Sequence, residues 1–171
     1  QPEPVEGGLL KKHSGFDRLN LTAQFNKTMT IQENISIKQY NTFGINIVAR
    51  FFAHFKTIDE LSELLEFKQL TTNNEQRSTL ILGGGSNILF TKNFDGLVLK
   101  NELNSIKEIK EDEHHVYVQV GAGENWHQFV LHCIKNGWAG VENLSLIPGN
   151  VGASPMQNIG AYGVEIKDVF F

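Results

Sequence analysis

The segment from residue 143 to residue 164 constrains the fold most, because it carries no charged side chain and yet cannot form a long regular element. Four glycines interrupt its hydrophobic pattern, at Gly149, Gly152, Gly160 and Gly163. The backbone polar groups of a long uncharged segment in a compact domain need partners, and a bound ligand can supply them. The segment therefore predicts a surface on which a planar ring system lies against the backbone. The alternative is a buried irregular connector.

A second glycine-rich stretch, Gly83-Gly84-Gly85-Ser86-Asn87, follows an apolar strand predicted over residues 79–82. Glycines let backbone amides approach an anion, and the side chains of Ser86 and Asn87 can add hydrogen bonds. A phosphate is the expected ligand, and a plain tight turn is the alternative. The loop is not a Walker A motif, because no Gly-Lys-Ser/Thr follows. Residues 88–96 are too short and turn-rich for the crossover helix of a Rossmann fold.

A third small-residue stretch, Gly121-Ala122-Gly123, lies between a strand predicted over residues 116–120 and a helix that begins near Asn125. The free amides at a helix N-terminus carry a partial positive charge. This loop could therefore face the same phosphate as residues 83–87. The alternative is a compact turn in which small residues allow close backbone packing.

Two helices are predicted from capping signals and apolar periodicity. Thr57 and Glu60 have the spacing of a capping box, which predicts a helix over residues 57–68. The second helix begins at Trp126 and is stopped by Asn136-Gly137. Both helices are expected to cover a sheet. The second has an apolar stripe expected to lie in the core: Trp126, Phe129, Val130, Cys133 and Ile134.

Strands are predicted over residues 79–82, 97–99, 106–110 and 116–120. The continuous apolar run Leu80-Ile81-Leu82 predicts burial on both faces, as in a parallel pair. The alternation over residues 116–120 predicts a half-buried strand. Residues 166–171 are predicted to form a further strand with an open edge. The pattern indicates an α/β or α+β domain.

Composition narrows the class of protein. With 171 residues, 40% of them hydrophobic, the chain can bury one core. A net charge of −4 without long blocks of one sign argues against a nucleic-acid or polybasic membrane partner. No apolar run approaches the roughly 18–20 residues of a membrane span, and no secretion signal opens the chain, so a cytoplasmic protein is expected. Residues 1–35 are predicted to be a disordered leader, with translation starting at Met29.

The cysteine and the histidines do not indicate a metal site. The lone Cys133 excludes an internal disulfide and a cysteine-based metal site. His127 and His132 are five residues apart and do not share a helix face, so both are predicted to be exposed. His114-His115 is predicted to lie in a charged hairpin turn.

Four motifs, in order and with fitting separations, resemble those of the UDP-N-acetylenolpyruvoylglucosamine reductase family, also called UDP-N-acetylmuramate dehydrogenases. They are Asn41-Thr42-Phe43-Gly44, the stretch from Leu80 to Phe90, Gly121 to His127, and Glu142 to Gly163. The resemblance covers residues 36–171. It implies an FAD-binding domain of the vanillyl-alcohol-oxidase and p-cresol methylhydroxylase type, an α+β fold with α/β-like segments, here truncated and without the substrate domain.

The resemblance also implies cofactor contacts. The pyrophosphate of FAD is expected on Gly83, Gly84, Gly85, Ser86 and Asn87, with a second contact at Gly121, Ala122 and Gly123 and a further one at Asn41. The flavin is expected along Ile147, Pro148, Gly149, Gly152, Ala153, Ser154, Asn158, Gly160, Tyr162 and Gly163. No histidine occurs in the first of these loops. Non-covalent FAD is therefore expected.

The family is a bacterial flavoenzyme of peptidoglycan synthesis. The resemblance implies that NADPH is the hydride donor in the intact enzyme and that the partner is a nucleotide sugar, UDP-N-acetylglucosamine enolpyruvate. The family's catalytic arginine, serine and glutamate lie beyond the matched motifs, so no catalytic residue is predicted and the isolated chain is expected not to turn over. The alternatives are another FAD-dependent oxidoreductase of this fold, acting on a sugar or alcohol, and a non-catalytic nucleotide- or flavin-binding remnant.

Overall fold

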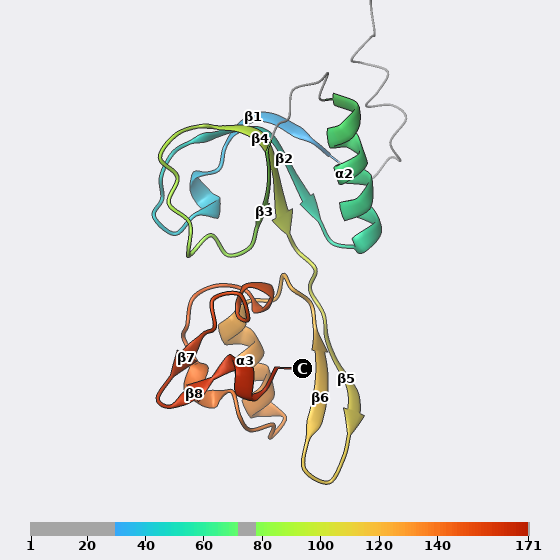
Figure 1. Ribbon diagram of the computed structural model, residues 1–171, viewed down its shortest axis with the longest axis vertical. Helices are drawn as coiled ribbons and strands as arrows, with labels where there is room; N and C mark the ends of the chain where they lie inside the picture. Colours follow the sequence, from blue (N-terminus) through green and yellow to red (C-terminus); the bar gives the residue numbers. More distant parts are fainter. Residues whose placement is uncertain (1–29, 72–77, 171) are drawn as a thin grey trace, which may run out of the picture.

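The computed structural model describes residues 30–71 and 78–170, which form two groups of elements (Figure 1). The first group holds a four-stranded sheet and helix α2. The second holds a long hairpin, helix α3 and several short elements. An extended stretch of chain runs from one group to the other between strands β4 and β5.

The sheet of the first group has the strand order β1-β2-β4-β3. Its strands are β1 (Gln32–Ser36), β2 (Val48–Phe55), β3 (Thr79–Leu82) and β4 (Phe94–Asn101). Strands β2, β4 and β3 are parallel, and β1 is antiparallel to β2. The carboxyl ends of the three parallel strands therefore lie at one edge of the sheet, where ligands bind in open sheets of this kind.

The parallel pairing predicted for residues 79–82 is confirmed, but burial on both faces is wrong. Ile81 is 54% exposed, because β3 is the edge strand of the sheet. Strand β4, one position further in, is the strand covered on both sides: Leu97, Val98 and Leu99 are at most 3% exposed. A short apolar run does not reveal whether a strand is central or at an edge.

Helix α2 (Ile58–Thr71) lies on one face of the sheet and begins at the predicted cap. The amide of Glu60 donates to the Thr57 hydroxyl at 3.1 Å, and the Glu60 carboxylate accepts from the amide of Lys56 at 2.6 Å. Leu64 is fully buried in the cluster that joins the helix to β2 and β4. Ile58, in contrast, is 62% exposed.

The second group begins with the hairpin of β5 (Ile106–Glu111) and β6 (Val116–Val120), which are antiparallel. The Asp112 carboxylate accepts hydrogen bonds from the amides of His114 and His115, at 2.9 and 2.8 Å. The prediction of a charged hairpin turn is confirmed.

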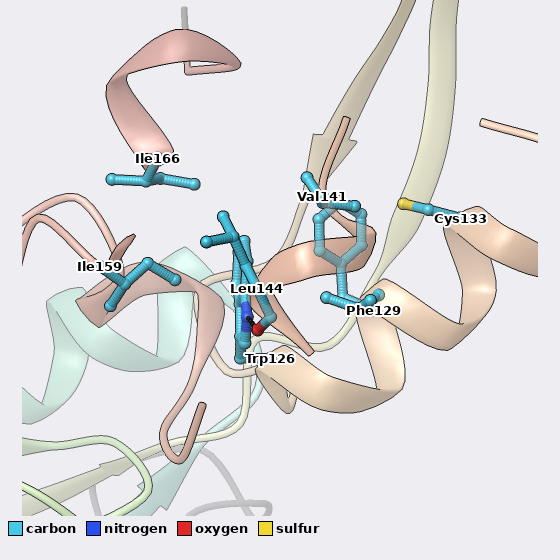
Figure 2. Packing of buried hydrophobic residues seen from close by; sticks show 8 residues of the cluster. Trp126, Phe129, Cys133, Val141, Leu144, Ile159 and Ile166 are labelled. Atoms are coloured by element: carbon cyan, nitrogen blue, oxygen red, sulfur yellow. Dashed lines mark hydrogen bonds between the residues drawn. The ribbon is translucent and has the colours of Figure 1, made fainter. Parts of the chain in front are cut away.

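Helix α3 (Trp126–Lys135) carries the core of the second group. Asn125 caps its N-terminus, and Gly137, with a φ of +74°, follows its end. Figure 2 shows Trp126 at the centre of the cluster, its indole N–H donating to the Leu144 carbonyl at 2.7 Å. The predicted stripe is confirmed except at Ile134, which is 51% exposed. At 100° per residue, that side chain lies at the margin of the stripe rather than on it.

The remaining elements are short. They are the 3₁₀ helices η1 (Lys38–Tyr40), η2 (Glu142–Leu144), η3 (Val151–Ala153) and η4 (Ile166–Asp168), and the two-residue strands β7 (Gly160–Ala161) and β8 (Val164–Glu165). The strand predicted over residues 166–171 is wrong where the structure describes it. A reciprocal cap between Glu165 and Asp168 starts η4, and Ile166 packs into the α3 core.

The folded part of the chain starts earlier than residue 36. Strand β1 pairs Gln32 with Phe52 and Ile35 with Ala49, so these residues belong to the sheet and not to a leader. The proposed start at Met29 lies outside the described residues. Within the described part, no helix is long and apolar enough to cross a membrane.

Candidate functional site

The structure brings the three glycine-containing stretches together. We call residues 83–87 the first glycine loop and residues 121–123 the second glycine loop. A Cβ atom added at Gly84 would lie 2.7 Å from Asn150 Oδ1 and 3.1 Å from the Cα atom of Gly149. The Asn150 side-chain amide in turn donates to the Gly123 carbonyl. One buried side chain of the uncharged segment thus contacts both loops.

The first glycine loop also packs against the turn that contains Asn41. Gly85 has a φ of +68°, and a Cβ atom there would lie 2.0 Å from the Tyr40 carbonyl oxygen. Asn41 is buried and holds this turn in shape. Its side-chain amide donates to the carbonyls of Ile37 and Ile45, and its Oδ1 accepts from the Ile45 amide. Asn41 therefore stabilises the turn against which the first glycine loop packs. A direct contact between Asn41 and a cofactor stays a prediction.

The backbone carbonyls and the backbone amides of the first glycine loop differ in whether they have hydrogen-bond partners. Two of its carbonyls are bound to the scaffold: Gly83 accepts from Lys100 Nζ at 2.9 Å, and Gly85 accepts from the Thr42 amide at 3.1 Å. Its amides are not. In the part of the chain that the structure describes, none of the five amides of residues 83–87 donates a hydrogen bond, although Gly85 is buried.

A buried amide without a partner is rare in folded proteins, because its desolvation is not repaid. Successive free amides form a concavity that binds anions. The loop also follows β3, at the edge of the sheet where the parallel strands end. These observations fit a phosphate group held by the backbone of the first glycine loop, and they argue against the plain-turn alternative.

The second glycine loop is different, because two of its three amides donate hydrogen bonds within the chain. Gly121 donates to the Ser105 carbonyl at 2.7 Å and Gly123 to the Leu103 carbonyl at 3.0 Å. A Cβ atom at Gly121 would lie 2.0 Å from the Leu103 oxygen, so only glycine fits there. The geometry supports the compact-turn alternative. Contact of Gly121, Ala122 or Gly123 with a cofactor remains a prediction.

The N-terminus of α3 is likewise occupied by the chain itself. The Gln128 amide donates to Asn125 Oδ1 at 3.1 Å, and the Trp126 amide donates to the Gly149 carbonyl at 3.0 Å. These two amides are not available to an anion. The sequence predicted a phosphate near this helix N-terminus. The first glycine loop is the better candidate for that phosphate, because its amides have no partner within the described residues.

The first half of the uncharged segment lies on the second glycine loop. Val151 donates to the Glu124 carbonyl at 2.9 Å and Gly152 to the Ala122 carbonyl at 3.1 Å. The Ser154 hydroxyl is buried and bonds within its own turn, to Val151. A narrow gap, too small to hold a ligand, lies here between Trp126, Ile147, Pro148, Gly149, Asn150, Ala153, Ser154, Gln157 and Ile159.

The second half of the uncharged segment forms a hairpin that presents its tip to solvent. Gly160 lies in β7, and Tyr162 and Gly163 make the turn to β8, with φ values of +52° and +82°. Tyr162 is 90% exposed, and Asn158 is exposed as well. The hairpin itself is anchored through Ala161 and Val164, which pack on the α3 core. Contact of these polar and glycine residues with a ligand remains a prediction.

Sequence reasoning missed Asn150 and Lys100. Asn150 is a buried polar side chain in a segment otherwise dominated by apolar and small residues. Lys100 directly follows the apolar run Leu97-Val98-Leu99 within β4, and this was the available signal. Loss of hydration lowers the pKa of Lys100, and the charge of Glu102 opposes this in part.

The histidine predictions need correction, whereas the cysteine prediction holds. His127 and His132 are partly buried rather than exposed. His127 Nδ1 lies 3.0 Å from the Ser145 hydroxyl and accepts from the Leu146 amide at 3.3 Å, because the chain after α3 folds back over the helix. Cys133 is buried in the core, and burial raises the pKa of its thiol to about 11. The described residues contain no group of three metal-ligating side chains.

Comparison with known proteins agrees with this geometry. The profile of the family described as "FAD binding domain" matches residues 49–171. The UDP-N-acetylenolpyruvoylglucosamine reductase of Amoebophilus asiaticus is 52% identical over 144 residues, which cover 83% of this chain and 41% of that protein. The enzyme of the same name from Flavobacterium johnsoniae is 51% identical over 142 residues, covering 83% and 40%. The chain thus spans about 40% of the length of these curated relatives.

A solved structure shares the fold. The crystal structure of UDP-N-acetylenolpyruvylglucosamine reductase from Thermus caldophilus superposes with a TM-score of 0.58 at 25% sequence identity. The match covers 82% of this chain and 46% of that one. The predicted α+β fold is confirmed.

Proposed function

This chain belongs to the FAD binding domain family, and from that premise we propose that it is the FAD-binding part of a UDP-N-acetylenolpyruvoylglucosamine reductase. One observation carries the proposal: within the described residues the five amides of the first glycine loop donate no hydrogen bond, whereas the scaffold binds the carbonyls of Gly83 and Gly85. A pyrophosphate has the charge and the acceptor oxygens that such a loop lacks. The sequence identity to enzymes of that name supports the choice of reaction.

The residues present fit FAD. Gly83, Gly84, Gly85, Ser86 and Asn87 would hold its pyrophosphate through backbone amides. The stretch around Ile147, Gly149 and Ala153 is uncharged and largely apolar, a composition that suits contact with an aromatic ring system. We propose that the flavin lies along this segment, toward Asn158, Gly160, Tyr162 and Gly163. FAD, when bound, supplies a group that accepts a hydride and passes it on.

The proposed reaction follows the name of the relatives. NADPH would be the hydride donor, and the double bond of the enolpyruvyl group of a UDP-sugar would take up the hydride and one proton, giving UDP-N-acetylmuramate for peptidoglycan. This places the protein in the cytoplasm, in the processes of cell-wall formation, cell shape and division. In the proposed reaction, the residues of this chain bind and orient the cofactor.

An FAD titration of the purified chain tests the proposal. We expect flavin to remain bound after desalting, with quenched or shifted fluorescence and a perturbed visible spectrum. Riboflavin, which has no pyrophosphate, is the matched control ligand and should be lost on desalting. A chain that is folded by circular dichroism but retains no FAD would contradict the proposal.

A further inference from the structure

Lys100 lies beneath the first glycine loop and has no part in the roles assigned above. It is on β4, in register with Leu82, the last residue of β3 before the loop. Its ammonium donates to the Gly83 carbonyl at 2.9 Å, and the side chain is partly buried. Partial loss of hydration makes an ammonium costly to keep, so a site that retains one has a use for its charge.

The geometry of the peptide bond links this contact to the free amides. The described chain contains no cis peptide bond, so the C=O and N–H of the Gly83–Gly84 peptide point in opposite directions. A carbonyl fixed toward Lys100 therefore turns the Gly84 amide to the other side of the loop. Thr42 does the same two peptides later, because its bond to the Gly85 carbonyl turns the Ser86 amide away.

The neighbouring acidic side chain does not neutralise Lys100 by direct pairing. Glu102 follows the end of β4, two residues after Lys100, and its carboxylate lies 2.7 Å from His54 Nδ1 and 4.0 Å from Lys56 Nζ. Within the described residues, the ammonium of Lys100 makes one hydrogen bond, which is the one to the Gly83 carbonyl. The positive charge is thus directed at the backbone of the loop.

We propose that Lys100 is a positioning residue for the pyrophosphate of FAD, which orients the Gly83–Gly84 peptide and polarises it so that the Gly84 amide becomes a stronger anion donor. A charged donor makes a stronger bond than a neutral one, and hydrogen-bonded groups in series polarise one another. The inference rests on the proposed function. It goes beyond that function by assigning a role to a residue on the sheet, outside every glycine motif.

The test compares two variants of the full chain, Lys100→Met and Lys100→Gln, with Lys92→Met as the matched control. Lys92 is exposed in the same β3–β4 connection, so its replacement removes an equal charge without touching the loop carbonyl. Binding is measured with FAD, with ADP and with riboflavin. ADP carries the pyrophosphate without the flavin ring, and riboflavin carries the flavin ring without the pyrophosphate.

We expect Lys100→Met to weaken FAD and ADP binding about tenfold and to leave riboflavin binding unchanged. Lys100→Gln keeps a donor without the charge and should lie between wild type and Lys100→Met. Lys92→Met should bind all three ligands like wild type. A purely structural role would instead lower riboflavin binding in parallel with that of ADP.

The outcomes separate the inference from the proposed function. Equal FAD and ADP affinity in wild type and in both Lys100 variants overturns the inference alone. Weakening of riboflavin binding to the same extent also overturns it. If the wild-type chain binds neither FAD nor ADP, the proposed function and the inference both fall. Should Lys100→Met not fold by circular dichroism, Lys100→Gln decides the matter by the same comparison.

Discussion

The first and second glycine loops have similar compositions but differ in which of their backbone groups form hydrogen bonds. In the second loop, Gly121 and Gly123 donate to the chain that precedes β5. In the first loop, the amides of residues 83–87 donate to no described residue, and the carbonyls of Gly83 and Gly85 are bound instead. Glycine content alone therefore does not identify a binding loop. The direction in which the scaffold holds each peptide does.

The largest expected effect concerns the second loop, which we regard as structural. Gly121→Ala would place a Cβ atom 2.0 Å from the Leu103 carbonyl oxygen, so the backbone has to shift. We expect the free energy of unfolding to fall by about 2–3 kcal/mol in urea titrations. Gly137→Ala, also glycine to alanine but in open space at a φ of +74°, is the control and should cost about 1 kcal/mol. An equal loss of unfolding free energy in the two variants would contradict a structural role for the second glycine loop.

A smaller effect is expected where the two loops meet. Asn150→Ala removes the bond to the Gly123 carbonyl and the packing against Gly84, so the unfolding free energy should fall by about 1–2 kcal/mol and FAD should bind more weakly. Denaturant titration and FAD titration measure the two effects. Asn143→Ala, at an exposed position of the same segment, should change neither. Unaltered FAD affinity in a folded Asn150→Ala variant would show that the loops act independently.

The smallest effect is a pH dependence in the α3 core. Burial favours the neutral thiol and raises the pKa of Cys133 to about 11. Between the ordinary thiol pKa and that value, the unfolded chain loses the proton and the folded chain keeps it, so stability falls as the pH rises. Cys133→Val should show a shallower decline in denaturant titrations over this range. Rapid alkylation of the folded chain at neutral pH would instead indicate that the thiol is accessible.

Elements with strong local signals could be predicted from the sequence. The cap at Thr57 and the apolar stripe from Trp126 depend on neighbouring residues only, and both were found. The two failures have different causes, one in the topology of the sheet and one in a local cap. Ile81 lies on an edge strand, which an apolar run cannot reveal, and the cap formed by Glu165 and Asp168 starts a 3₁₀ turn where apolar residues suggested a strand.

The site could be predicted as a set of segments but not as an arrangement. Residues 83–87 and the uncharged segment were identified because their compositions are unusual. That Asn150 contacts both glycine loops depends on how the two groups of elements meet, which no local pattern encodes. The same holds for Lys100, whose role follows from the register of β4 against β3. Whether each amide donates a hydrogen bond within the chain likewise depends on the tertiary structure.

Hydrogen exchange of individual backbone amides, followed by NMR with and without FAD, tests the central claim most directly. In the free chain, the amides of residues 83–87 should exchange rapidly, whereas those of Gly121 and Gly123 should be protected by their bonds to Ser105 and Leu103. On addition of FAD, protection should appear at residues 83–87 and change little at Gly121 and Gly123. Bound FAD without added protection at residues 83–87 would contradict the assignment of the first glycine loop as the pyrophosphate site.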